Sequence, residues 1–182
     1  PEKDKIKIDY KINNLLDDKT LNSSTKTVAL GIIQFADLFK LIKPDLVVIM
    51  ADRYEVIAPA IASSYQNIPL AHVQGGEISG NIDEKVRHAV TKLSNIHFPA
   101  TKKSMQNIIQ MGENKKNVFK TGCPSIDIAK EIIRNKKKLS FDIYKKYGGV
   151  GSFPNLDKGY VVVMQHPVTD ENKISGKQII ET

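Results

Sequence analysis

The chain has 182 residues, a formal net charge of +7 and a hydrophobic fraction of 41%. This composition suits one α/β domain with a sizeable core and excludes a disordered chain. No apolar run reaches the roughly 18 residues of a membrane-spanning helix, and no basic-then-apolar leader opens the sequence. The single cysteine, Cys123, excludes an internal disulfide framework and fits a reducing compartment, so we expect a cytoplasmic protein.

The positive charge is spread over lysine pairs and one basic run, Arg134–Lys138. No aromatic residues interleave with this run, and no nucleic-acid-binding motif accompanies it. Lysines in such places are typical of solvated helix ends, where they suit the negative end of the helix dipole. We therefore expect neither nucleic acid nor a membrane as a partner.

Short apolar runs alternate with helical periodicity along the chain. Apolar residues at helical spacing predict helices around residues 29–39, 56–64, 86–93 and 126–133. The alternation with short connections predicts an α/β fold with a doubly wound parallel sheet. The expected strands are Lys5–Ile8, Leu46–Met50, Leu70–Val73, Ile96–Phe98, Val118–Thr121 and Tyr160–Met164.

A glycine-rich segment interrupts this alternation at residues 148–159 and reads as a linker. We therefore expect a first lobe at residues 1–147. The strand expected at Tyr160–Met164 would then open a second domain, within residues 160–182.

Chemically functional residues follow three of the predicted strands. Ligands bind outside the carboxyl ends of the strands in open parallel sheets, and right-handed crossovers bring successive strands to one rim. The residues after Leu46–Met50 and after Leu70–Val73 should therefore face one crevice. These candidates are Asp52, Arg53 and Glu55 after the first of these strands, His72, Gln74, Gly75, Gly76 and Glu77 around the end of the second, and His166 after Tyr160–Met164.

The helix after the glycine pair adds four more ionisable candidates: Asp83, Glu84, Arg87 and His88. Each candidate also has a structural explanation. Asp52 with Glu55, and Asn81 with Glu84, resemble capping boxes. Asp83 with Arg87, and Glu84 with His88, are ordinary i,i+4 pairs. A histidine inside an apolar strand, such as His72, is taken alone more often a hydrogen-bonded core histidine, and the glycines could form an ordinary turn. No metal-type spacing is evident, so we expect no metal.

At these residues the chain resembles the hydrolysing UDP-N-acetylglucosamine 2-epimerases, which make N-acetylmannosamine for sialic acid synthesis. The matching motifs occur in the family's order and spacing and span about two-thirds of the chain. They are Ala51–Glu55, His72–Gly80, Ile82–Ser94, Gly122–Asp127 and Gln165–Thr169. The family usually has glycine at the position of Ala51, and many members carry glutamate at that of Gln74.

The resemblance implies two Rossmann-like lobes of the glycosyltransferase-B type, with the sugar nucleotide between them. Residues 1–147 would then be an N-terminal lobe without its first strand and helix, and residues 160–182 the start of the nucleotide-binding lobe. It also implies a UDP-sugar substrate and no cofactor. We expect a homo-oligomer at full length and no turnover from this chain alone.

By the same resemblance we assign roles to the candidate residues. Asp52 and Glu84 are expected to perform acid/base catalysis, with Asp83 as a substitute, and His166 to act on the diphosphate or the leaving group. The expected substrate-binding residues are Arg53, Glu55, His72, Gln74, Gly75, Gly76, Glu77, Arg87 and His88.

Two alternatives stay open. The related hydrolysing epimerase of UDP-2,4-diacetamido-2,4,6-trideoxyglucose, on the legionaminic acid route, is the second reading within the enzymes. From a different class, a non-catalytic nucleotide-sugar binding module is also compatible with Ala51 and Gln74.

Overall fold

The computed structural model describes residues 7–16, 20–135, 141–153, 155–166 and 175–181. The chain divides into two compact units, residues 1–124 and residues 125–182. The division into a lobe at 1–147, a linker at 148–159 and a second lobe from 160 stays a prediction.

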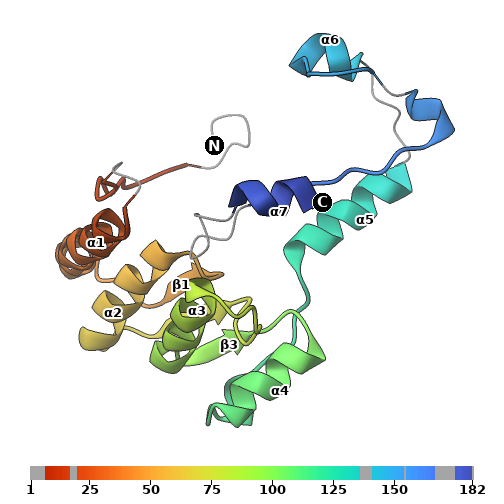
Figure 1. The fold of residues 1–182 in the computed structure, drawn as a ribbon. Coiled ribbons are helices and arrows are strands. Elements are labelled where there is room, and N and C mark those ends of the chain that lie inside the picture. Colours follow the sequence, from red (N-terminus) through yellow and green to blue (C-terminus); the bar gives the residue numbers. More distant parts are fainter. Residues whose placement is uncertain (1–6, 17–19, 136–140, 154, 167–174, 182) are drawn as a thin grey trace. The chain divides into compact units, whose positions relative to one another are not determined.

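The first unit is built on a parallel sheet of three strands in the order β1-β2-β3. Beyond β3, Val118 adds a single parallel bridge to His97. The strands are β1 (Val47–Met50), β2 (Leu70–Val73) and β3 (Ile96–Phe98), close to the predicted ranges. The predicted α/β fold with a parallel sheet is confirmed (Figure 1).

Helices connect the strands as the alternating pattern predicts. α1 precedes β1, η1 and α2 lead from β1 to β2, α3 leads from β2 to β3, and α4 and η2 follow β3. Figure 1 shows α1, α2 and α3 next to one another. Their bounds are α1 Leu21–Ile42, η1 Tyr54–Val56, α2 Ile57–Tyr65, α3 Ile82–Leu93, α4 Lys102–Gln110 and η2 Lys115–Asn117.

The core lies between α2, α3 and one face of the sheet. Its buried members are Ile49, Ala60, Leu70, Val86 and Val90. Burial alternates along β1, because successive side chains point to opposite faces of a sheet: Ile49 is buried, whereas Val48 and Met50 are 61% and 55% exposed. The helices therefore cover the face of β1 on which Ile49 lies.

Three sequence predictions differ from the structure. Tyr160–Met164 is exposed and has no regular secondary structure, since no neighbouring strand among the described residues of its unit pairs with it. Val118–Thr121 contributes only the bridge at Val118. At Lys5–Ile8, residues 5 and 6 lie outside the described residues, and Ile8 has no strand structure.

The second unit consists of short elements. The helix predicted around residues 126–133 is confirmed within α5, which begins at Pro124, the last residue of the first unit. No helix in the described residues is both long and apolar enough to cross a bilayer. The elements are α5 (Pro124–Asn135), α6 (Ile143–Tyr147), η3 (Leu156–Lys158) and α7 (Ser175–Glu181). Of the basic run Arg134–Lys138, residues 136–138 lie outside the described residues.

Candidate active site

The central contact of the candidate site joins the loop after β1 to helix α3. The Arg87 guanidinium donates to Oδ2 of Asp52 through Nε, at 2.9 Å, and through a second nitrogen. Arg87 is only 4% exposed, and it also donates to the backbone carbonyl of Glu77 at 2.5 Å. Two charge-assisted hydrogen bonds to this one oxygen hold the Asp52 carboxylate at the guanidinium. Three segments that the sequence predicted at one rim thus meet at Arg87.

Asp52 does not cap the following helix. The N-cap of η1 is Arg53, without a side-chain hydrogen bond, because the Asp52 carboxylate turns to Arg87 instead. The same contact replaces the Asp83–Arg87 pair that helical spacing allows. Asp52 is therefore held by tertiary structure, not by local helix capping.

Glu84 orders the loop that leads into α3. Its Oε2 accepts the backbone N–H groups of Ser79 and Gly80, each at 2.5 Å, while the Asn81 side chain accepts the N–H of Glu84. The predicted capping box is thus half formed, since the carboxylate bonds the two residues before the N-cap. These two N–H groups lower the pKa of Glu84 below its ordinary value of 4.5, so the carboxylate is ionised at neutral pH.

His72 is a core histidine. It is fully buried, its Nδ1 lies 3.1 Å from the Thr91 hydroxyl, and its Nε2 lies 3.0 Å from the carbonyl of Ala51. Burial lowers the pKa of His72 from 6.5 to about 4, against the opposing effect of the Ala51 carbonyl. A neutral ring with both nitrogens engaged favours a positioning role over direct contact with sugar hydroxyls.

The paired glycines allow close packing of the loop. A Cβ on Gly75 would lie 2.8 Å from His72 Nδ1, and one on Gly76, where φ is +82°, would lie 2.3 Å from the Ser104 carbonyl oxygen on α4. Asn107 of α4 also donates to the carbonyl of Gly76 at 2.8 Å. The need for glycine therefore comes from side chains of β2 and α3 at Gly75 and from α4 at Gly76, so no ligand is required to explain these residues.

The other candidates lie around this centre in different settings. Arg53, with a side chain 74% exposed, pairs with Glu55 at 2.7 Å. Gln74, at φ +63°, donates to the Cys123 thiol at 3.1 Å. Nε2 of His88 is buried without a hydrogen-bond partner among the described residues. The side chain of Glu77 is exposed, and the contact with Arg87 is made by the backbone carbonyl of Glu77.

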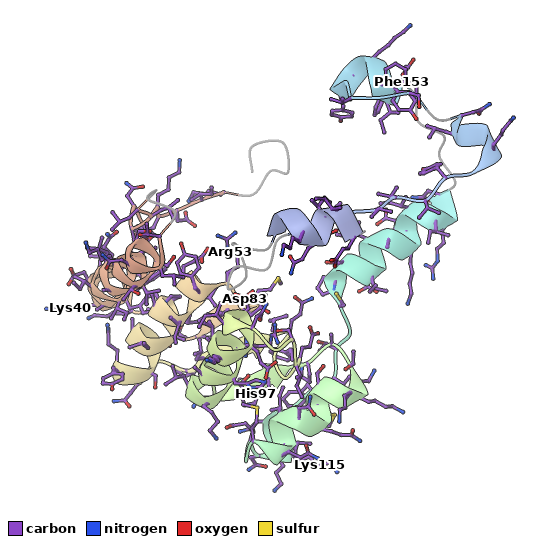
Figure 2. The ribbon with its side chains drawn as sticks, in the orientation of Figure 1. Lys40, Arg53, Asp83, His97, Lys115 and Phe153 are labelled. Carbon is purple, nitrogen blue, oxygen red and sulfur yellow. The ribbon has the colours of Figure 1, made fainter. Side chains whose placement is uncertain are left out.

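Asp83 and Arg53 lie at the same end of the first unit in Figure 2, at the start of α3 and after β1. The nearest hydrogen-bonding contact of Asp83 in the described part of the chain is a long one, 3.5 Å from Asn81 Nδ2. His166 belongs to the second unit, where residues 160–166 have no regular secondary structure, and its role stays a prediction. The motif that contains it continues into residues 167–169, outside the described residues.

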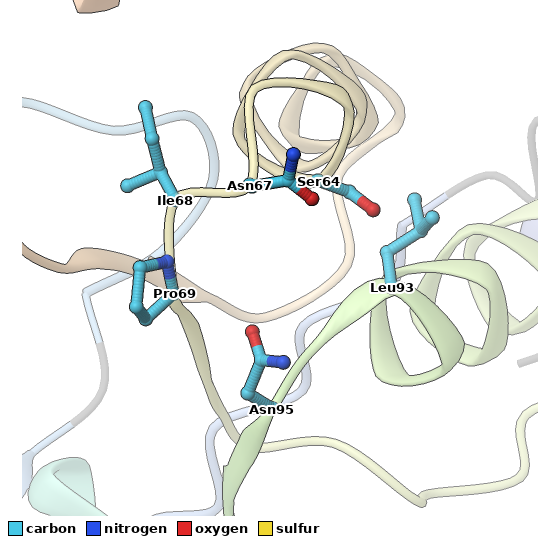
Figure 3. A pocket seen from close by; sticks show the side chains of 6 residues that line it. All are labelled: Ser64, Asn67, Ile68, Pro69, Leu93 and Asn95. Carbon is cyan, nitrogen blue, oxygen red and sulfur yellow. The ribbon is translucent and has the colours of Figure 1, made fainter.

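A pocket of about 260 Å³ opens at the other end of the strands. Pro69 and Asn95, which precede β2 and β3, line it together with Ser64 and Leu93 near the ends of α2 and α3 (Figure 3). It lies at the amino ends of the strands and is separate from the Asp52 rim. Among the described residues, no cluster of three or more His, Cys, Asp or Glu side chains is arranged to hold a metal ion.

Comparison with known proteins shows the family to which the chain belongs. A sequence model of the UDP-N-acetylglucosamine 2-epimerase family matches residues 2–182. The chain belongs to this family. It is 38% identical over 150 residues to a hydrolysing UDP-N,N'-diacetylbacillosamine 2-epimerase of Legionella pneumophila, covering 82% of this chain and 38% of the relative. It is 35% identical to the polysialic acid biosynthesis protein P7 of Escherichia coli, covering 96% and 41%.

The fold agrees with a solved member of the family. The structure of UDP-GlcNAc 2-epimerase from Neisseria meningitidis, bound to UDP-GlcNAc, superposes with a TM-score of 0.63 at 27% identity, covering 71% of this chain and 36% of that one. The chain thus spans about two-fifths of the length of its curated relatives. The predicted family and its glycosyltransferase-B-type lobe are confirmed.

Sequence reasoning missed Thr91 and the backbone conformation of Ala51. Ala51 has a φ of +65°, in the left-handed region that favours glycine. The preference of the family for glycine at this position was a signal for that conformation. Thr91 lies one helical turn after Arg87, on the same face of α3, which was the only signal that the sequence offered for it.

Proposed function

We propose that the full-length protein is a hydrolysing UDP-sugar 2-epimerase that converts UDP-GlcNAc and water into N-acetylmannosamine and UDP. The observation that carries this proposal is the Arg87–Asp52 contact, which ties one carboxylate to α3 about one helical turn after Asp83 and Glu84. Carboxylates gathered at one rim of a parallel sheet are suited to proton transfer at a bound ligand. Membership of the family supplies the class of substrate.

The reaction inverts C2 of the sugar, whose proton is hard to remove because no adjacent carbonyl stabilises a carbanion. Departure of UDP first would build positive charge at C1 and acidify the C2 proton. A carboxylate then removes that proton and leaves a glycal-like intermediate. Water adds at C1 and a proton returns to the other face of C2, so acid/base groups are needed on both faces, and cations to hold the diphosphate.

The side-chain environments support a division of these roles. Glu84 is ionised at neutral pH and can therefore accept a proton, but the two backbone N–H groups that lower its pKa also make it a weaker base. Asp52 is the second acid/base group, with its carboxylate oriented by Arg87. Asp83, with only its long contact to Asn81 in the described residues, is the substitute. His166 is assigned to the diphosphate or the leaving group.

A second substrate has support from the relatives. The Legionella pneumophila relative is named for UDP-N,N'-diacetylbacillosamine, which matches the alternative of a UDP-2,4-diacetamido-2,4,6-trideoxy sugar. Its 38% identity is close to the 35% of the polysialic acid protein, so both substrates belong in one assay.

The decisive experiment incubates the full-length protein with each UDP-sugar in D₂O. We expect release of UDP together with the 2-epimerised free sugar carrying deuterium at C2, and no effect of a chelator. Asp52→Asn and Glu84→Gln should each lower turnover by roughly 10² to 10⁴. Asp45→Asn is the control, because Asp45 is an exposed carboxylate at the amino end of β1.

The results distinguish an epimerase from a non-catalytic binding module and test the roles of the two carboxylates. Binding of UDP-sugars without deuterium incorporation would favour the non-catalytic module. Full turnover in both carboxamide variants would remove Asp52 and Glu84 from the mechanism. The 182-residue chain alone should release no product, since the proposed cleft needs a complete second lobe; the homo-oligomer and the cytoplasmic location stay predictions.

A further inference from the structure

Two residues on one face of α3 reach the turn that follows β1. Arg87 contacts the Asp52 carboxylate directly. Thr91, one helical turn later, contacts Nδ1 of His72, and Nε2 of that ring contacts the carbonyl of Ala51, the residue before Asp52. Helix α3 therefore reaches the same turn twice, once through a side-chain ion pair and once through a buried histidine.

We propose that Thr91 and His72 are positioning residues for Asp52: they fix the left-handed turn at Ala51 and so the direction in which Asp52 enters the active site. The effect on catalysis rests on the proposed function, whereas the hydrogen bonds among Thr91, His72 and Ala51 do not depend on it. The three linked groups, the Thr91 hydroxyl, the His72 ring and the Ala51 carbonyl, are called the threonine–histidine link below.

The chemistry of these atoms fixes the protonation of the link. A carbonyl oxygen only accepts, so His72 Nε2 carries the proton that is donated to Ala51. Nδ1 is then the acceptor, and the Thr91 hydroxyl donates to it. Thr91 and His72 are both fully buried, so water does not replace either partner.

The surrounding residues explain why such a link is useful. Ala51 has a φ of +65°, a conformation that an alanine side chain disfavours, so contacts from outside the turn must hold it. Val73 supplies one, by accepting the Ala51 N–H at 3.0 Å, and His72 supplies the other. Gly75 packs directly against the threonine–histidine link, since a Cβ at this position would lie 2.8 Å from His72 Nδ1 and 2.9 Å from the Thr91 hydroxyl.

The test compares Thr91→Val with Thr91→Ser in the full-length protein. Valine keeps the shape of threonine but loses the hydroxyl, whereas serine keeps it. We expect Thr91→Val to lower kcat at least about tenfold with little change in KM, because small displacements of a catalytic group are costly, and Thr91→Ser to restore most of kcat. Thr27→Val is the matched control, since Thr27 is a buried threonine of α1 whose hydroxyl accepts the N–H of Leu16.

Two readouts do not depend on catalysis. Nitrogen-15 NMR of the wild-type ring should show His72 protonated at Nε2 and not at Nδ1. Hydrogen exchange of the backbone amides at residues 51–56 should accelerate in Thr91→Val but not in Thr27→Val. A proton on Nδ1 in the wild type, or equal exchange in the two valine variants, would overturn the inference.

These outcomes also separate the inference from the proposed function. A wild-type protein that turns over neither UDP-sugar contradicts the function, while the NMR and exchange results still decide the link. An active wild type whose Thr91→Val variant has the same kcat as Thr27→Val contradicts the positioning role alone.

Discussion

Arg87 of α3 holds the carboxylate of Asp52, although the two residues are 35 positions apart in the chain. Arg87 is almost fully buried, whereas the side chain of Asp52 is 28% exposed. The pair therefore has a buried cation and a carboxylate that still meets solvent. Such an arrangement lets Asp52 face a ligand while its direction is set from within the protein.

The first prediction concerns the strength of this pair. A double-mutant cycle with Arg87→Met and Asp52→Asn in the full-length protein should give a coupling energy of about 1–3 kcal/mol, because the interaction is charge-assisted and largely sheltered from water. Urea unfolding at pH 7 measures it. Arg53 with Glu55 is the control pair: Arg53 is 74% exposed, so its coupling should stay below about 1 kcal/mol. Equal coupling in the two pairs would contradict the special role of Arg87.

The second prediction separates steric crowding from backbone strain in the glycine loop. Gly76 and Gly80 have similar φ values, +82° and +79°, but a Cβ at Gly76 meets backbone at 2.3 Å, whereas nothing lies within 4 Å at Gly80. Gly80→Ala should cost about 1 kcal/mol from strain alone. Gly76→Ala should cost at least about 2 kcal/mol more, because α4 must shift. Thermal unfolding of the two variants checks the difference, and equal losses would show that α4 yields freely.

The third prediction uses the left-handed conformation of Ala51. Ala51→Gly should stabilise the protein by about 0.5–1 kcal/mol, since removal of the disfavoured Cβ outweighs the greater freedom of glycine in the unfolded chain. The same change at Ala29, an exposed position inside α1, should destabilise it by about 1 kcal/mol. Denaturant unfolding measures both signs, and a loss of stability in Ala51→Gly would refute the strain argument.

The fourth prediction concerns pH. The pKa of His72 is lowered from 6.5 to about 4 in the folded protein. On acidification the His72 side chain is therefore protonated in the unfolded chain at a higher pH than in the folded protein, so the free energy of unfolding falls as the pH drops from 6.5 toward 4. At about 1.4 kcal/mol for each pKa unit, His72 alone accounts for about 2 kcal/mol between pH 7 and pH 5. Glu84 stays ionised over this interval because its pKa is lowered.

Urea unfolding at pH 7 and pH 5 tests this. His72→Gln should be less stable than the wild type at pH 7 but should lose less stability on acidification. Some pH dependence should remain, since burial also lowers the pKa of His97. If His72→Gln and the wild type lose the same stability between the two pH values, His72 does not titrate as its burial implies.

Local sequence patterns predicted the elements that carry strong apolar periodicity. The three short apolar runs became β1, β2 and β3, and the stripe at Val86, Val90 and Leu93 became the core face of α3. Helix α4 was missed because its buried residues include Ser104 and Asn107, which an apolar pattern does not contain. Tyr160–Met164 was predicted as a strand because β propensity is local, whereas a strand also needs a neighbour for its backbone hydrogen bonds.

By itself, the sequence determined which chemical groups gather at the carboxyl ends of β1 and β2, because strand ends and helix starts follow from short-range periodicity and capping. Only the tertiary structure decided how the groups that lie far apart in the chain pair: Arg87 with Asp52 instead of Asp83, and His72 with Thr91 and Ala51. Helical spacing makes several partners equally near along the chain. The choice among them depends on the sheet, which brings distant backbone and side-chain atoms within hydrogen-bonding distance and removes the water that would otherwise compete.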